Sequence, residues 1–155
     1  MKLKQILFVA LFTILLLPKV SVSHCEIPCG IYDDELRFSL LAEDITTIEK
    51  SMNSITELSS AGDKNYNQIV RWVTNKEEHA TKFMDIVTQY FMTQRVAVVA
   101  PGADGYDTYV KKVTLLHSML RSAMKCKQTT DLENTKALSN SLTEFKELYM
   151  SEHKH

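Results

Sequence analysis

The chain has little of the two residues that build turns. Only 4 of its 155 residues are glycine and 3 are proline, whereas folds rich in hairpins and loops use both residues often. This scarcity argues against an all-β or loop-rich fold. The sequence also contains no internal repeat, no low-complexity tract and no sign of a second domain, and its length suits one domain.

A basic surplus is missing as well. The chain has 18 basic and 19 acidic side chains. Three of the lysines lie in the suspected leader described next, and without them 15 basic side chains stand against 19 acidic ones, a net charge of −4. Proteins that bind nucleic acids normally carry a basic excess, so we exclude that class. Apolar residues make up 45% of the chain, which is enough for a sizeable core.

Residues 1–23 have the features of a secretory leader, namely a basic start, an apolar run at 6–17 and small residues before a cleavage point. Ser21 and Ser23 stand three residues and one residue before His24. A membrane-spanning helix needs about 20 apolar residues, and this run has 12. The sequence therefore predicts export to a periplasmic, lumenal or secreted location. A signal peptidase or leader protease would cut before His24, and the mature form would have no membrane segment.

Four amphipathic stretches follow, each with apolar residues at spacings of three to five. They predict helices over residues 33–59, from 63 or 65 to about 94, from 106 or 107 to about 126, and from 130 to about 151. The last begins at a capping-box pattern, with Thr130 followed by Glu133. Residues 95–107 are β-like and then rich in turn formers, and predict a crossing loop with one short extended segment.

Short connections between such helices favour an all-α, antiparallel up-and-down four-helix bundle. We expect a single domain over residues 24–155, preceded by the leader 1–23. The side chains predicted to face inward are, helix by helix, Leu36, Leu40, Leu41, Ile45, Ile48, Met52, Ile55 and Leu58; Tyr66, Ile69, Val70, Val73, Ala80, Met84, Val87 and Phe91; Tyr109, Val113, Leu116, Leu120 and Ala123; Leu132, Leu138, Leu142, Phe145 and Tyr149.

The polar run Lys-Glu-Glu-His at 76–79 interrupts the apolar face of the second predicted helix. Such a run is typical of a solvated face. The alternative is that one of its side chains contacts the metal-binding stretch described below.

The stretch 24–33 gathers two of the three cysteines with a histidine, a proline and a glycine. Cleavage before His24 would expose its α-amine beside its imidazole, the main-chain nitrogen of Cys25, and the thiolates of Cys25 and Cys29. Five potential donors thus lie within six residues. A square plane of amine, amide nitrogen and two sulfurs fits Ni(II) or Cu(II), whereas a tetrahedron of sulfur and imidazole fits zinc. Thiolate and amidate donors also bring trivalent nickel within reach.

Pro28 and Gly30 suit a tight turn that brings Cys29 toward Cys25, because an Xaa-Pro bond can be cis and glycine adopts conformations closed to other residues. Two cysteines in an exported protein are most often a disulfide, and the spacing alone also leaves free thiols open. The position of His24 at the predicted cut favours the metal, since a disulfide would not require it.

The pattern His-Cys-x-x-Pro-Cys-Gly-x-Tyr-Asp at 24–33 resembles the nickel-binding hook of nickel-containing superoxide dismutases. Arg-Trp-Val at 71–73, Asn-Lys-Glu-Glu-His-Ala at 75–80 and Gln-Tyr-Phe at 89–91 resemble the second helix of the family's marine branch. The similarity covers residues 24 to about 150.

The resemblance implies a four-helix bundle that assembles as a homohexamer. It implies one nickel ion per subunit, bound by the amine and imidazole of His24, the main-chain nitrogen and thiolate of Cys25, and the thiolate of Cys29. The implied reaction is the disproportionation of superoxide to dioxygen and hydrogen peroxide by Ni(II)/Ni(III) cycling. The imidazole would bind in the oxidised state and leave in the reduced one. Tyr32 would shape the approach to the metal and hold ordered water.

The chain also departs from the family pattern. Glu26 stands where the family commonly has Asp, so the carboxylate is kept but lies one methylene further out. An arginine that supports the hook histidine in better-known members aligns with His79, and a glutamate that bonds the same imidazole falls near Leu40 or Leu41 and is absent. Residues that support the ligands fix their orientation. We therefore assign that role to His79 and, through the turn, to Pro28.

Two other functional readings stay open on the sequence alone. One is an exported, non-catalytic bundle that binds nickel or copper with the same stretch, and the other is a plain helical protein with a Cys25–Cys29 disulfide. Any steering of the superoxide anion must come from local lysines because the mature chain is acidic, and Lys64 and Lys76 are the candidates.

The remaining histidines and the third cysteine are interpreted as structural. Cys126 is expected to be a buried or idle thiol, His117 a packed or surface residue, and His153 and His155 part of a solvated tail.

Overall fold

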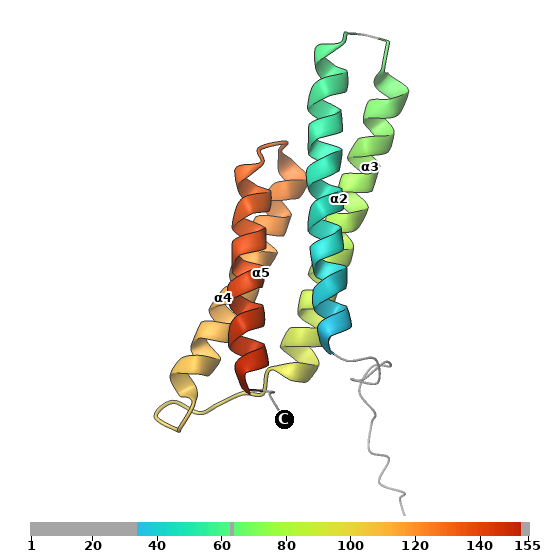
Figure 1. The fold of residues 1–155 in the computed structure, drawn as a ribbon. Helices are drawn as coiled ribbons and strands as arrows, with labels where there is room; N and C mark the ends of the chain where they lie inside the picture. Colours follow the sequence, from blue (N-terminus) through green and yellow to red (C-terminus); the bar gives the residue numbers. More distant parts are fainter. Residues whose placement is uncertain (1–33, 63, 153–155) are drawn as a thin grey trace, which may run out of the picture.

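The computed structural model describes residues 34–62 and 64–152, and these form helices joined by short connections. In order, they are α2 (Asp34–Ser60), α3 (Tyr66–Asp85), the π-helix η1 (Ile86–Arg95), α4 (Tyr106–Gln128) and α5 (Glu133–Glu152). Since η1 continues α3 directly, the described residues contain four long helices and no strand (Figure 1). The predicted all-α class, a helical bundle, is confirmed. The predicted crossing stretch after η1 contains no strand among its described residues, and its first residue, Val96, has extended backbone at φ −96° and ψ 96°.

The helices pair as α2 with α3 and as α4 with α5 (Figure 1). The α2–α3 pair projects beyond the α4–α5 pair at one end of the molecule. The other end brings together the start of α2, the π-helix η1 and the end of α5 (Figure 1). This second end matters for function because residue 33 and the stretch before it join the chain there.

No helix in the described part of the chain is both long and apolar enough to cross a membrane.

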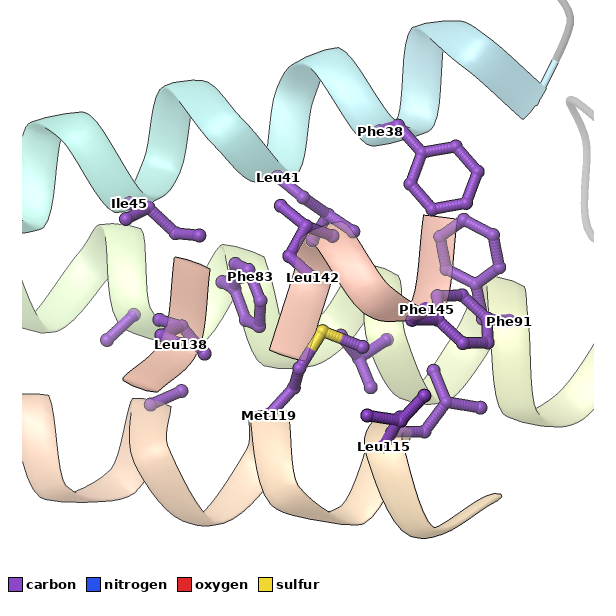
Figure 2. Packing of buried hydrophobic residues seen from close by; sticks show 14 of the residues in the cluster. Phe38, Leu41, Ile45, Phe83, Phe91, Leu115, Met119, Leu138, Leu142 and Phe145 are labelled. Atoms are coloured by element: carbon purple, nitrogen blue, oxygen red, sulfur yellow. The ribbon is translucent and has the colours of Figure 1, made fainter. Parts of the chain in front are cut away.

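The core lies between the two helical pairs and is almost wholly apolar. Figure 2 shows Leu41, Phe83, Met119 and Leu142 pointing toward one another from the helices around them. One end of this core is aromatic. Its rings, with centroids 4.9 to 5.9 Å apart, are those of Phe38, Phe91, Phe145 and Tyr149, which we call the aromatic cluster. It binds α2, η1 and α5 together at the end where the chain continues toward residue 33.

The predicted inward faces are largely confirmed for α2 and α5. Four of the five residues predicted for the last helix are buried, and Leu132 packs against them. In α2 the buried side chains from Leu41 to Ile55 follow the prediction, but Leu36 is 46% exposed and Phe38, which was not predicted, takes the core position.

The predicted inward face of α3 is wrong at its first two turns. Tyr66, Val70 and Val73 are exposed, with Tyr66 at 64%. The first turns of α3 belong to the part of the α2–α3 pair that projects beyond α4 and α5, so neither α4 nor α5 covers them (Figure 1). Further along, Ala80, Val87 and Phe91 are buried as predicted, and Phe83 joins them.

The helix ends are set by a few specific groups. Gly62, which follows α2, has the positive φ of +84° that glycine adopts readily at a helix end. At the start of α5 the carboxylate of Asp131 accepts a hydrogen bond from the main-chain N–H of Glu133 at 3.0 Å. Asp131, one residue after the predicted Thr130, is therefore the capping side chain.

The run at 76–79 is solvated only in part, because Glu78 is exposed whereas Lys76 is buried. Lys76 is only 4% exposed, and its ammonium donates to the main-chain oxygens of Lys127 at 2.6 Å and Thr129 at 3.2 Å. Cations suit the carboxyl end of a helix, where carbonyl groups lack partners. Lys76 thus caps α4, and this buried, hydrogen-bonded ammonium does not support the predicted role in steering superoxide. Lys64 is exposed.

Candidate functional site

Most of the predicted metal site lies outside the residues that the structure describes. The predicted ligands and their neighbours all precede residue 34: His24, Cys25, Glu26, Pro28, Cys29 and Tyr32. Their roles stay predictions. The structure does define the place where this stretch joins the bundle, which is Asp34, the first residue of α2.

Asp34 is buried, and three side chains from distant parts of the chain donate hydrogen bonds to its carboxylate. The hydroxyl of Tyr90 donates to Oδ1, the hydroxyl of Tyr149 to Oδ2 at 2.7 Å, and Nη2 of Arg95 to Oδ2 at 2.6 Å. Nε of Arg95 also donates to the hydroxyl of Tyr149 at 3.0 Å. We call these four residues the Asp34 cluster. It joins the first residue of α2 to η1 and to the last turns of α5.

The π-helix explains how two residues of η1 reach the same carboxylate. In an α-helix, side chains five positions apart point roughly 140° away from each other. The wider π-helix pairs each residue with the one five positions on, which brings Tyr90 and Arg95 to the same side. The guanidinium carbon of Arg95 lies 5.9 Å from the centroid of the Tyr90 ring, and both side chains bond Asp34.

The hydrogen bonds decide the ionisation of the cluster. Burial alone would raise the pKa of Asp34, but the donors Tyr90, Tyr149 and Arg95 outweigh it and hold the pKa of this carboxyl below its ordinary value of 3.8. Burial and the bond to Asp34 raise the pKa of Tyr90 to about 12, and the same causes raise the pKa of Tyr149. The bond to Asp34 raises the pKa of Arg95. At neutral pH the cluster therefore holds one carboxylate, one guanidinium and two protonated phenols.

The rest of the first turn of α2 is fastened in the same way. The guanidinium carbon of Arg37 lies 4.8 Å from the centroid of the Tyr90 ring. The ammonium of Lys146 on α5 pairs with Glu35 and lies 5.6 Å from the centroid of the Phe38 ring. Phe38 itself belongs to the aromatic cluster. The chain therefore enters the bundle at a helix start that contacts both η1 and α5.

His79, the one candidate supporting residue that the structure describes, forms a pair with a carboxylate on α2. Its Nδ1 lies 2.7 Å from Oδ1 of Asp44, and the side chains are 21% and 9% exposed. A carboxylate only accepts hydrogen bonds, so Nδ1 carries the proton, and in the neutral ring Nε2 is left as an acceptor. Burial raises the pKa of Asp44, against the lowering effect of His79. The carboxylate of Asp44 on α2 therefore holds the His79 ring in one orientation.

The position of this pair is within reach of the hook. Asp44 lies ten residues after Asp34 on one helix, which is roughly 15 Å along the axis. His24 lies ten residues before Asp34, and ten extended residues span at most about 36 Å. The geometry is thus compatible with a contact between His79 and the hook, while the contact itself stays a prediction.

The other residues singled out in the sequence have structural environments. Cys126 is fully buried and free, and burial raises the pKa of its thiol to about 11, which confirms the expected buried thiol. His117 is exposed. Residues 34–62 and 64–152 contain no group of three His, Cys, Asp or Glu side chains that could hold a metal ion.

A groove of about 930 Å³ runs between α2 and α5. The residues that line it include the apolar Phe38, Ile45 and Leu142, and many of the others are polar or charged, such as Ser39 and Lys146. It contains no histidine or cysteine, and His79 does not line it.

Sequence reasoning missed two features of this end of the molecule. Asp34 was given no partner and Arg95 was placed in the crossing loop, because their contact spans 61 residues and depends on the π-helix. Asp44 received no role, since its partner lies 35 residues away on another helix. Nothing in the sequence around Asp44 indicates that its partner is a histidine.

A protein-family comparison identifies the chain directly. The family model for nickel-containing superoxide dismutase matches residues 19–154, nearly the whole chain and all of the stretch 24–33. No curated protein and no solved structure gives a match. With a four-helix architecture, an intact donor set at 24–29 and a family match of this extent, the chain belongs to the nickel-containing superoxide dismutase family.

Proposed function

We propose that the nickel ion of this superoxide dismutase is held by the hook at residues 24–33, one ion per subunit. The ligands are the amine and imidazole of His24, the main-chain nitrogen and thiolate of Cys25, and the thiolate of Cys29. The chemistry of these donors supports the proposal. Nitrogen and thiolate donors in a tetragonal arrangement suit nickel, and all of them come from one short segment. The observation that carries it is the family match, which includes this segment.

The reaction is the disproportionation of two superoxide anions and two protons to dioxygen and hydrogen peroxide. When bound, nickel supplies the one-electron couple between its divalent and trivalent states that this reaction needs. The protein must therefore hold the two sulfurs and the nitrogens in place, admit a small anion and exclude larger reductants. In this proposal Tyr32 controls access to the metal, and Glu26 supplies a carboxylate near it. Pro28 forms the turn that aligns Cys25 with Cys29.

His79 supports the imidazole of His24 in this proposal. The family glutamate that bonds this imidazole is missing near Leu40 or Leu41, and His79 replaces the family arginine. The carboxylate of Asp44 restores the negative charge of the missing glutamate, but it contacts His79 and not the imidazole of His24. With the proton of His79 on Nδ1, Nε2 is left to accept a hydrogen bond from the ring N–H of His24. Such supporting bonds set the orientation and basicity of metal ligands.

Maturation and assembly follow from the same site. The leader 1–23 is removed by a signal peptidase or leader protease, which frees the amine of His24 and places the enzyme in an exported compartment. The domain 24–155 folds as an antiparallel up-and-down bundle, a topology supported by the short connections between successive helices. The subunits assemble as a homohexamer.

Metal analysis and a superoxide assay test the ligand assignment. The mature protein, started at His24 and loaded with nickel, should hold one nickel per subunit and remove superoxide. Cys25→Ser and Cys29→Ser should each lose both properties, whereas Cys126→Ser, which alters the third cysteine, should keep both. Nickel retained in the Cys25→Ser and Cys29→Ser variants would contradict the assignment.

The role of His79 has its own test. His79→Ala should retain nickel but lower the rate about tenfold to a hundredfold, the range seen when supporting groups of metal ligands are removed. Asp44→Asn, which leaves the histidine in place without its carboxylate, should fall between wild type and His79→Ala. Unchanged nickel content and rate in His79→Ala would remove this residue from the site.

A further inference from the structure

We propose that the Asp34 cluster is a positioning device for the nickel hook, which fixes the point and direction in which residues 24–33 leave the bundle. This inference rests on the proposed nickel site. It assigns a function to Asp34, Tyr90, Arg95 and Tyr149, none of which is a proposed ligand.

Very little chain separates the hook from the Asp34 cluster. Asp34 follows the hook directly, and Cys29 lies only five residues before it. Five extended residues span at most about 18 Å. Any displacement of Asp34 is therefore passed to the nearest proposed thiolate ligand through a short length of chain.

The start of α2 is held far more firmly than helix ends usually are. Terminal turns of helices commonly fray. Here Asp34 bonds three donors, Glu35 pairs with Lys146, and Phe38 packs among the rings of the aromatic cluster. Those partners come from η1 and α5, whose residues lie 56 to 115 positions away from Asp34. The first turn of α2 is thus fixed relative to the rest of the bundle.

The π-helix η1 supplies two of the three side chains that bond Asp34. A ten-residue π-helix, Ile86–Arg95, is rare, and π-helical turns occur often at functional sites. Its effect in this molecule is to direct both Tyr90 and Arg95 at Asp34, which a continuous α-helix would not do. The backbone of the second long helix is therefore distorted where it holds the base of the hook.

The charged groups of the Asp34 cluster serve orientation better than stability. A buried ion pair is a poor source of stability, since apolar side chains of the same volume often serve as well or better. What a carboxylate with three donors provides is a single orientation, because each oxygen has a defined partner. A fixed origin for a metal-binding segment requires such an orientation.

Nickel release from the mature, nickel-loaded protein into an excess of chelator tests this inference. Asp34→Asn removes the charge, and Arg95→Gln removes the guanidinium while keeping Asp34 and both tyrosines, so one variant remains if the other fails to fold. We expect each to release nickel about tenfold faster than wild type, a loss comparable to that of other groups that orient metal ligands. Amide hydrogen exchange at residues 34–38 should rise in the same variants.

Leu138→Ala is the matched control. It opens a cavity in the core, eleven residues and roughly 16 Å along α5 from Tyr149, and so lowers stability without altering the cluster. Leu138→Ala should release nickel within about twofold of wild type.

Three results would count against the inference. Wild-type release rates in Asp34→Asn and Arg95→Gln would overturn it and leave the nickel site intact. Equal acceleration by Leu138→Ala would also overturn it, because global stability would then explain the effect. A wild-type protein that binds no nickel at all would overturn the proposed site together with this inference.

Discussion

Removal of the Tyr149 hydroxyl is the most specific perturbation that the structure offers. In Tyr149→Phe the ring remains, and its centroid lies 5.7 Å from Phe38 and 5.6 Å from both Phe91 and Phe145, so the aromatic packing is kept. The change removes the donor at 2.7 Å from Oδ2 of Asp34 and the acceptor at 3.0 Å from Nε of Arg95.

The magnitude follows from these two bonds. A hydrogen bond to a charged group contributes about 1.5–3 kcal/mol to stability. The full sum is not expected, because Asp34 keeps Tyr90 and Arg95 and Arg95 keeps Asp34. We therefore expect Tyr149→Phe to lower the free energy of unfolding by about 2 kcal/mol, measured by urea denaturation at pH 7 with circular dichroism.

Tyr109→Phe is the control for this measurement. The hydroxyl of Tyr109 has no hydrogen-bond partner in the described part of the chain, so its removal should change the free energy of unfolding by less than about 0.5 kcal/mol. If Tyr149→Phe also changed it by less than that amount, the Asp34 cluster would not stabilise the fold, and the reasoning from its geometry would be refuted.

Three further outcomes are expected. The pKa of Asp34 is lowered in the folded protein, so its carboxylate stabilises the fold above the unfolded pKa near 3.8, and this stabilisation is lost as pH falls through the folded pKa. Urea titrations between pH 5 and pH 2 should show a steeper loss of stability for wild type than for Asp34→Asn. Parallel curves for the two proteins would contradict this. Lys76→Met should lower the free energy of unfolding by about 1.5 kcal/mol, because two carbonyl groups at the end of α4 lose a charged donor; an unchanged midpoint in urea would show that water replaces the ammonium. The Cys126 thiol, buried and with a pKa raised to about 11, should resist iodoacetamide in the native protein and react only after unfolding; peptide mass spectrometry that finds it alkylated in the native state would show that the core opens readily.

The helices were predictable from the sequence because their signals are local. The apolar spacing of residues 41–55 placed the first helix at 33–59, within one residue of the observed bounds of α2, Asp34–Ser60. Four of the five residues predicted to face inward from the last helix are buried for the same reason. These signals lie within one element, so no knowledge of the tertiary structure was needed.

Features that depend on contacts between elements were missed. The exposure of Tyr66 and Val70 follows from the shorter reach of α4 and α5, which the pattern on α3 alone does not contain. The sequence favoured a solvated position for Lys76, because it does not show that the carboxyl end of α4 lies beside this side chain. The π-helix has no distinctive spacing in the sequence, so the position of Arg95 in a helix and its bond to Asp34 were not foreseen.

The candidate metal site is a case of strong local information. All its proposed ligands fall within six residues, which indicated a metal site but left nickel, copper and zinc open. The resemblance of residues 24–33 to the nickel hook then indicated nickel and the family that the comparison matched. The residues that support the site are different. His79 was found only through the family pattern, and its partner Asp44 only through the structure.

We propose above all that the nickel ion is bound by the α-amine of His24, which is free only after the leader is removed. Native mass spectrometry of the active enzyme tests it in one step, because the intact mass reports both the first residue and the bound metal. The account predicts a subunit that begins at His24 and carries one nickel ion. An active subunit that retains any residue before His24 would lack the free amine and would contradict the claim.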